Sequence, residues 1–321
     1  MNKILKLLSV LILVFTLQSC SNDNDEDYGM LPRTIAEIVD SSMNYTFLSY
    51  ALKQTNLVSV LNGTDKYTLM APSNIAFRSF LMTNGYQNID EVPLQVLKKI
   101  LLNHVLGGEL EYQNIESGYY KTAAPSEASV NTLSMYINQV NMRVKINGES
   151  VITQGNVRAS NGIIHAVDRV IPLPSLVTFV TADTSLSNLT SALTRTDLTT
   201  DFVTALSTKL GVSPAPFTVF APTDQAFINL LVELGVQNLS DINEPTLKAT
   251  LSYHVISGTN ALSTDLSDNL QLNTLGGVIT ANISGGATLT DGNNRISKIV
   301  GVDIQATNGV IHLIDKVILP N

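Results

Sequence analysis

The hydrophobic and polar positions form a helical part followed by a strand part, and this order occurs twice along the chain. Apolar residues recur at helical spacing over residues 34–40 and 45–61, so each segment is predicted to be a helix. Residues 134–171 instead alternate apolar and polar positions between turns, which is typical of strands. Helices first and strands later within one unit predict an α+β fold.

Two phrases repeat and divide the chain. KYTLMAPSNIAF at 66–77 returns as PFTVFAPTDQAF at 216–227. NGIIHAVDRVIPLP at 161–174 returns as NGVIHLIDKVILPN at 308–321. A period of roughly 150 residues is longer than that of solenoid repeats. We therefore predict two tandem domains, residues 33–173 and 174–321.

The first repeated phrase predicts the start of a helix. A short strand runs into Ala-Pro, and the Ser or Thr that follows is placed to cap a helix whose apolar positions come next. Pro93 and Pro245 each stand at the start of a further helix. The residues of the phrase are Ala71, Pro72 and Ser73 in the first copy and Ala221, Pro222 and Thr223 in the second.

The second phrase predicts a turn and a strand. The dipeptides Asn161-Gly162 and Asn308-Gly309 are predicted hairpin turns, because both residue types tolerate positive φ. On the strand that follows, alternation puts Ile163, His165, Val167 and Ile171 on one face and Ile164, Ala166 and Val170 on the other.

Chemistry by the repeated histidines is disfavoured by the same alternation. His165 and Asp168 point to opposite faces, and so do His312 and Asp315, so neither carboxylate can orient its imidazole as a base. An imidazole among apolar neighbours is more often buried, with its nitrogens bonded to backbone or a nearby side chain. We interpret both histidines as structural.

Composition argues against several functional classes. The chain has 19 Lys and Arg against 27 Asp and Glu, a net charge of −8, which disfavours binding to nucleic acid or to anionic lipid. Each repeat offers two histidines and no cysteine, so no metal site or cofactor is expected. Residues 290–294, TDGNN, fit a hairpin tip better than a calcium loop. Without a Gly-x-Ser-x-Gly elbow or a phosphate loop, we expect no enzyme.

The N-terminus predicts export. Lys3 and Lys6 precede a mostly apolar run at 7–17 that is too short to span a bilayer, as in a secretory signal over residues 1–19. Leu17-Gln18-Ser19-Cys20 resembles the lipobox of bacterial lipoproteins, which implies acylation of Cys20, the only cysteine. Residues 20–32 are then an acidic, flexible tether. The tether resembles the export signals of surface lipoproteins in Bacteroidetes-type bacteria, and a plain spacer is the alternative.

Together the ordered motifs resemble the fasciclin (FAS1) domain family, twice over and across nearly the whole chain after the tether. The matching elements are the Ala-Pro-Thr phrase before an Ala-Phe helix, a central Tyr-His, and Asn-Gly-x-x-His-x-x-Asp-x-Val. The resemblance implies two α+β domains, each a β-wedge or sandwich flanked by helices, in a secreted or anchored adhesion protein. It also implies receptor contact near the Tyr-His stretch, so Tyr253, His254 and His104 become candidate binding residues. Ser73 and Asn103 depart from the family pattern in the first copy.

Three functions are compatible with these features. The first is a lipid-anchored protein of the outer membrane, facing the cell surface or the periplasm, that binds a protein or polysaccharide through its two domains. The second is a carbohydrate-capture accessory, for which exposed aromatics are needed; tryptophan is absent. The third is an uncharacterised hydrolase, which lacks a recognisable site. The aromatic candidates for carbohydrate are Tyr112, Tyr119, Tyr120 and Tyr136.

Overall fold

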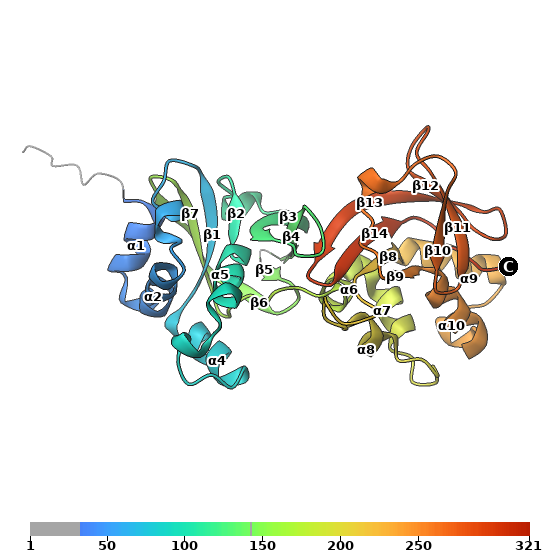
Figure 1. Ribbon diagram of the computed structural model, residues 1–321, viewed down its shortest axis with the longest axis horizontal. Helices are drawn as coiled ribbons and strands as arrows, with labels where there is room; N and C mark the ends of the chain where they lie inside the picture. The colour runs from blue at the N-terminus through green and yellow to red at the C-terminus, as the bar shows by residue number, and fades with distance from the viewer. Residues whose placement is uncertain (1–32, 142) are drawn as a thin grey trace, which may run out of the picture. The chain divides into compact units, whose positions relative to one another are not determined.

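The computed structural model describes residues 33–321 except residue 142. Arg33–Asn321 form one compact unit that contains the same α+β arrangement twice in sequence order (Figure 1). Within that unit no helix is both long and apolar enough to cross a membrane. The signal, Cys20 and the tether, residues 1–32, lie outside the described residues.

The first domain begins with its helices and ends with its strands. The helices are α1 (Ile35–Ser41), α2 (Thr46–Gln54), α3 (Val58–Leu61), α4 (Asn74–Thr83) and α5 (Leu94–Asn103), with the 3₁₀ turns η1 (Met43–Tyr45), η2 (Ile89–Glu91) and η3 (Tyr112–Asn114). The strands are β1 (Tyr67–Pro72), β2 (Val105–Gly107), β3 (Gly118–Pro125), β4 (Thr132–Val140), β5 (Arg143–Ile146), β6 (Ser150–Ala159) and β7 (Gly162–Val167).

The second domain repeats this order. Its helices are α6 (Leu176–Ala182), α7 (Ser187–Leu193), α8 (Phe202–Leu206), α9 (Asp224–Leu234) and α10 (Glu244–Tyr253), with the 3₁₀ turns η4 (Thr184–Leu186), η5 (Leu239–Asp241) and η6 (Ser263–Asp265). The strands are β8 (Phe217–Pro222), β9 (Val255–Ser257), β10 (Leu270–Thr274), β11 (Gly277–Asn282), β12 (Thr288–Thr290), β13 (Ile296–Ala306) and β14 (Gly309–Ile314).

The predicted helix over residues 45–61 is two helices. α2 ends at Gln54, and Asn56 adopts a left-handed φ of 56° before α3 begins. Asparagine tolerates this conformation, which a continuing helix does not allow. The sequence pattern was therefore right about helical structure and wrong about its continuity.

The helix starts agree with the capping prediction. The hydroxyl of Ser73 accepts a hydrogen bond from Ala76 N at 3.2 Å, and that of Thr223 accepts one from Ala226 N at 3.4 Å. α4 and α9 therefore begin directly after the Ala-Pro end of a strand, as the repeated phrase indicates.

Each domain has one sheet of seven strands in equivalent order. In the first domain the sheet closes on itself in the order β1-β2-β3-β4-β5-β6-β7, with β1 parallel to β7 and Met70 opposite His165. In the second domain the order is β10-β11-β12-β13-β14-β8-β9, with β8 parallel to β14 and Phe220 opposite His312. The remaining strand pairs are antiparallel.

The second sheet stays open where the first one closes. In the first domain Leu106 of β2 pairs with Thr122 of β3. In the second, β9 and β10 end the sheet, and a single backbone hydrogen bond, Leu275 N to Val255 O at 2.8 Å, joins the strand regions.

Two apolar layers fill each domain, one between helices and sheet and one inside the curved sheet. Ile164 belongs to the helix-side layer of the first domain, whereas Val167 and Ile171 belong to the inner layer. Even-numbered and odd-numbered positions along and after β7 thus face different cores, which is the alternation that the sequence predicts. The corresponding layers of the second domain contain Ile311 and Ile314.

The turn between β6 and β7 differs from the prediction. Ala159 pairs with Gly162, so the turn residues are Ser160 and Asn161, and Gly162 is already the first residue of the strand. Of the Asn-Gly pair only Gly162 has a positive φ, +148°. A Cβ on Gly162 would lie 1.9 Å from Tyr67 O, so glycine is required by close backbone approach as well as by φ.

Candidate functional site

The histidine of the second repeated phrase holds a bulge in the neighbouring strand. His165 Nδ1 accepts a hydrogen bond from Asn156 N at 3.2 Å, and its Nε2 bonds to Leu110 O at 2.8 Å. Asn156 has a φ of 60° and lies where the register of β6 shifts against β7. With both nitrogens engaged and the side chain buried, His165 is part of the fold.

His312 repeats this arrangement in the second domain. Its Nε2 bonds to Ala261 O at 2.9 Å, and its Nδ1 faces Asp303 N at 3.5 Å, again at a positive φ within a bulge. The carboxylates after these histidines bond elsewhere. Asp168 Oδ1 accepts from Val151 N at 2.7 Å, and Asp315 Oδ1 accepts from Lys298 N at 2.7 Å. Neither carboxylate reaches an imidazole, so the phrase forms no catalytic dyad.

The central histidines connect a helix end to the segment after the last strand. His104 Nδ1 bonds to Ile100 O at 2.7 Å, and its Nε2 accepts from Ile171 N at 2.8 Å. His254 does the same with Thr250 O at 2.7 Å and Ile318 N at 3.2 Å. These bonds bring together residues up to 67 positions apart in the sequence.

The candidate binding residues are therefore corrected. His104, His254 and Tyr253 are 0%, 3% and 2% exposed, and a ligand cannot contact such side chains. The Tyr253 hydroxyl donates to Val278 O at 2.6 Å, and its ring packs against Gly277 at the start of β11. Asn103, at the equivalent position, donates instead from Nδ2 to Pro172 O at 3.1 Å.

The buried histidines make stability depend on pH. Burial lowers the pKa of His104 and of His254 to about 4, against a backbone hydrogen bond that raises it. In the unfolded chain a histidine titrates near 6.5. Below about pH 6.5 these histidines are protonated in the unfolded chain but stay neutral in the folded one. Each histidine therefore lowers the free energy of unfolding by up to ~1.4 kcal/mol per pH unit between about pH 6.5 and pH 4.

We expect the unfolding free energy to fall as the pH is lowered through this window. The imidazole carbon shifts of His104 and His254 should stay those of the neutral ring down to about pH 5, because both pKa values lie near 4. Histidine NMR spectra recorded against pH test this directly. Titration of either residue at pH 6 or above in the folded protein would contradict the structural assignment.

Asn161 and Asn308 have a structural role that sequence reasoning missed. Asn161 Oδ1 accepts from Ile35 N at 2.8 Å, and its Nδ2 donates to Leu61 O at 2.8 Å and to Gly63 O at 3.0 Å. Asn308 bonds in the same way to Leu176 N, Leu206 O and Thr208 O. Each asparagine thus fastens two helical segments to the end of a strand. The exact recurrence of Asn in both phrases was the available signal.

Two of the tyrosines proposed for carbohydrate lie at the contact between the domains. The Tyr119 hydroxyl donates to Asp183 Oδ2 at 2.8 Å, and its ring packs edge-on against Phe179, with centroids 5.5 Å apart. Burial, together with the Asp183 carboxylate, raises the pKa of Tyr119. Tyr136 is 4% exposed and belongs to the core cluster of the second domain. Neither ring is available to stack on a sugar.

Polar contacts extend this junction. Lys121 Nζ donates to Asp303 O at 2.5 Å. Gln305 is buried; its Oε1 accepts a hydrogen bond from the Ser129 hydroxyl at 2.7 Å, and its backbone N donates to Ser134 Oγ at 3.0 Å. The region that the two copies share least is thus the region where they touch. Of the other two tyrosines, Tyr120 donates to Glu116 O at 2.9 Å, and Tyr112 packs 6.2 Å from His165.

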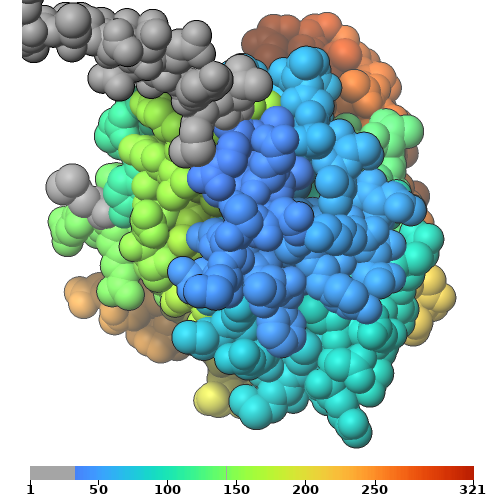
Figure 2. Space-filling model, turned by 90° about the vertical axis from the view of Figure 1, so that its left-hand side faces the viewer, coloured from blue at the N-terminus to red at the C-terminus, as the bar shows by residue number. Residues whose placement is uncertain are grey.

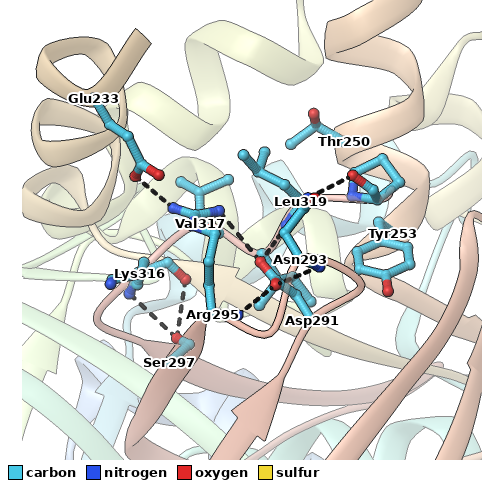
Figure 3. A network of polar contacts seen from close by, with 12 residues as sticks. Glu233, Thr250, Tyr253, Asp291, Asn293, Arg295, Ser297, Lys316, Val317 and Leu319 are labelled. Carbon is cyan, nitrogen blue, oxygen red and sulfur yellow. Dashed lines mark hydrogen bonds and ion pairs between the residues drawn. The ribbon is translucent and has the colours of Figure 1, made fainter.

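A buried charged network closes the second domain (Figure 3). Residues 291–295 form the tip between β12 and β13, one position later than the predicted tip at 290–294, and they include Asp291, whose carboxylate is fully buried. This carboxylate accepts from Asn293 N, Arg295 N, Leu319 N and Arg295 Nη1. Arg295 also donates to Val317 O at 3.0 Å and to Glu233 at 2.6 Å. The network fastens the end of the second repeat to a hairpin.

Metal ligands do not cluster in the described part of the chain, where no group of three or more His, Cys, Asp and Glu side chains is arranged to hold an ion. The histidines, aspartates and asparagines of the two repeated phrases form hydrogen bonds with backbone atoms of the same domain. Their arrangement shows that these side chains stabilise the fold.

Comparison with known proteins identifies the repeated architecture. The fasciclin domain model matches residues 43–174 and 184–320. Human periostin is 29% identical over 265 residues, covering 81% of this chain and 29% of periostin. Pig transforming growth factor-beta-induced protein ig-h3 is 26% identical over 279 residues, covering 84% and 35%. The chain thus spans about a third or less of the length of these two relatives.

Shorter and structural relatives agree. The uncharacterized protein sll1735 of a Synechocystis strain is 35% identical over 151 residues, covering 46% of this chain and 98% of sll1735. Among solved structures, a FAS1 domain pair from the insect cell adhesion molecule fasciclin I aligns with a TM-score of 0.50 and 19% identity, covering 84% of this chain and 92% of that one. Because the family model matches both repeats over most of their length, the chain belongs to the fasciclin family and carries two FAS1 domains in tandem.

Proposed function

We propose that this protein is a non-enzymatic lipoprotein of the cell envelope that binds a protein or polysaccharide ligand and so mediates adhesion. The observation that carries the proposal is the match of both repeats to the fasciclin domain. A FAS1 domain pair from the insect cell adhesion molecule fasciclin I has the same fold as this chain. Two domains on one chain also permit bivalent contact with a repetitive ligand, which raises avidity without a strong single site.

The placement of the motif side chains supports a function without catalysis. His165 and His312 bond to backbone atoms, while Asp168 and Asp315 bond to other strands. A general base needs an accessible nitrogen within reach of a substrate proton, and a buried imidazole with both nitrogens engaged does not offer one.

Adhesion is favoured over carbohydrate capture by the position of the tyrosines. The capture hypothesis relied on an exposed aromatic platform, and Tyr119 and Tyr136 are placed against the second domain instead. We therefore carry forward only the adhesive function, in which the ligand is a partner protein or a matrix polysaccharide.

Attachment through Cys20 is the second part of the proposal, and it depends on the sequence of residues 1–32 alone. Replacement of Cys20 by alanine is expected to release or misprocess the protein without unfolding it, because residue 20 precedes the first domain. Membrane fractionation and mass measurement of the mature N-terminus check this. A lipidated, membrane-bound Cys20→Ala product would contradict the anchor.

Protease treatment of intact cells that express the protein tests where it faces. Loss of the protein from whole cells, with a periplasmic control protein intact, is the result expected for a surface adhesin. The same cells are then tested for attachment to immobilised matrix proteins and polysaccharides. Protection until the outer membrane is opened would instead place the ligand inside the envelope and exclude adhesion to other cells.

A further inference from the structure

The first domain has a surface recess that is lined by an exposed tyrosine and a carboxylate. The recess has a volume of about 270 Å³ and lies between α2 and η2. In Figure 2 the blue and cyan segments of the first domain, to which these two elements belong, adjoin on the surface. Its floor is apolar and its rim polar. The lining residues are Thr46, Phe47, Tyr50, Asn88, Ile89 and Asp90.

An exposed aromatic ring and a carboxylate are held together at the rim of this recess. Tyr50 is 40% exposed, and its hydroxyl donates to Asp90 Oδ1 at 2.7 Å. The hydrogen bond to Asp90 raises the pKa of Tyr50, so the phenol keeps its proton. The ring of Phe47 is fixed by stacking on Phe77, with centroids 6.3 Å apart. These contacts preorganise the recess before any ligand arrives.

Several polar hydrogens around the recess already have partners within the domain. The Thr46 hydroxyl donates to Asn74 Oδ1 at 3.2 Å, and Asn88 Nδ2 donates to Glu91 Oε1 at 3.2 Å. The Tyr50 hydroxyl donates its hydrogen to Asp90. The carboxylate of Asp90, which carries the negative charge of the recess, lies beside its apolar residues Phe47 and Ile89. Such a site fits a group with several N–H donors at the end of an apolar stem.

In the second domain an arginine bonds to the segment that corresponds to η2. Equivalent hydrogen bonds show which residues of the two domains correspond. Phe47 N donates to Asn74 Oδ1 in the first domain, and Asn188 N donates to Asp224 Oδ1 in the second. Arg195 Nη1 donates to Leu239 O at 2.8 Å and to Ile242 O at 2.7 Å, against η5, the counterpart of η2.

The residues that form the recess change together between the domains. Phe47, Tyr50 and Asp90 correspond to Asn188, Ser191 and Ser240, whereas Arg195 corresponds to Gln54. In the first domain Arg78 lies over the ring of Phe47, 5.5 Å from its centroid, and it does not line the recess. The counterpart of Arg195 in the first domain is the uncharged Gln54.

We propose that the recess of the first domain binds an arginine side chain presented by a protein partner. The guanidinium would meet the Asp90 carboxylate while its methylene stem lies along Tyr50 and Ile89. The net charge of −8 favours such a basic partner. The inference rests on the proposed adhesive function and narrows its ligand to a protein with an exposed arginine.

Amide chemical shifts of the full, isotope-labelled chain test the site with a defined probe. The probe is the peptide acetyl-Gly-Arg-Gly-amide, and its control carries citrulline, which has the same shape without the charge. We expect the arginine peptide to shift the amides of residues 46–50 and 88–91, and the citrulline peptide to leave them unchanged. Equal shifts with both peptides, or shifts with a neutral oligosaccharide instead, would overturn the proposal.

Three variants separate the site from general charge attraction. Asp90→Asn should weaken binding of the arginine peptide by up to about fivefold, as expected for loss of one solvent-exposed ion pair. Asp65→Asn, which changes the same charge at an exposed position outside the recess, should not weaken it. Gln54→Arg introduces the residue of the second domain and should block the peptide from within the chain. Equal binding by all three variants would contradict the site.

The same variants show whether the arginine site or the proposed adhesive function is wrong. If Asp90→Asn and Gln54→Arg lose peptide binding and attachment to protein-coated surfaces together, both proposals stand. If attachment persists while peptide binding is absent in the unmodified chain, the recess is not the adhesive site and the adhesive function stands. If the peptide binds and no surface is bound, the adhesive function fails and the arginine site remains.

Discussion

Arg295→Ala is expected to destabilise the second domain by about 3–5 kcal/mol, the usual effect of leaving a buried charge without its partner. The side chain of Asp291 is 0% exposed, and Arg295 is the cation that faces it, at 3.2 Å. The substitution also removes the donor to Val317 O. Urea unfolding of the variant measures the loss.

Glu233→Ala is the matched control for Arg295→Ala. It removes the other carboxylate that Arg295 contacts, but this one is 47% exposed. A solvent-exposed ion pair contributes only about 0–1 kcal/mol. If Arg295→Ala reduces the unfolding free energy no more than Glu233→Ala does, the buried network in Figure 3 is not what secures the hairpin.

Asn161→Ala is the second change with a large expected effect. It leaves one backbone N–H and two backbone carbonyls without their partner, at Ile35, Leu61 and Gly63. An unsatisfied buried group costs about 1–3 kcal/mol, and partial access of water reduces the sum, so we expect a loss of about 3–5 kcal/mol. Thermal and urea unfolding check the value, and protection of the α1 amides from hydrogen exchange should fall first.

Two further variants make this second prediction specific. Asn161→Asp keeps the acceptor for Ile35 N but replaces the donor group that serves Leu61 and Gly63, so it should destabilise as well. Asn44→Ala changes an exposed asparagine in η1 and should stay within about 0.5 kcal/mol of the unmodified protein. An Asn161→Ala protein as stable as the Asn44→Ala protein would show that α1 does not depend on this side chain.

The order of helices and strands follows from local signals that a sequence displays. Ser73 and Thr223 cap helices through an N–H three residues away, and β7 shows its two faces by simple alternation. Interactions within three or four residues depend on residue type and spacing alone. For this reason the α+β class, the tandem arrangement and the helix starts were predictable, whereas the break at Asn56 required one backbone dihedral angle that periodicity does not show.

The roles of individual side chains were less predictable because their partners are distant. The sequence indicated that His165 is structural, but not that it bonds to Leu110, 55 residues earlier. The family resemblance implied receptor contact near His254 and Tyr253, whose side chains the fold buries. Burial depends on which segments pack over a residue, and this is set by the whole domain.

What the sequence by itself determined is thus the family, the repeat and the local elements, since these depend on short-range spacing. The tertiary structure alone decided that Tyr119 and Tyr136 join the domains, that Asn161 fastens α1, and that Tyr50 and Asp90 form a recess. The hydrogen bonds Tyr119–Asp183, Ile35–Asn161 and Tyr50–Asp90 each join residues at least 40 positions apart in the sequence. Such contacts form only when the chain closes loops whose geometry the pattern of hydrophobic positions does not specify.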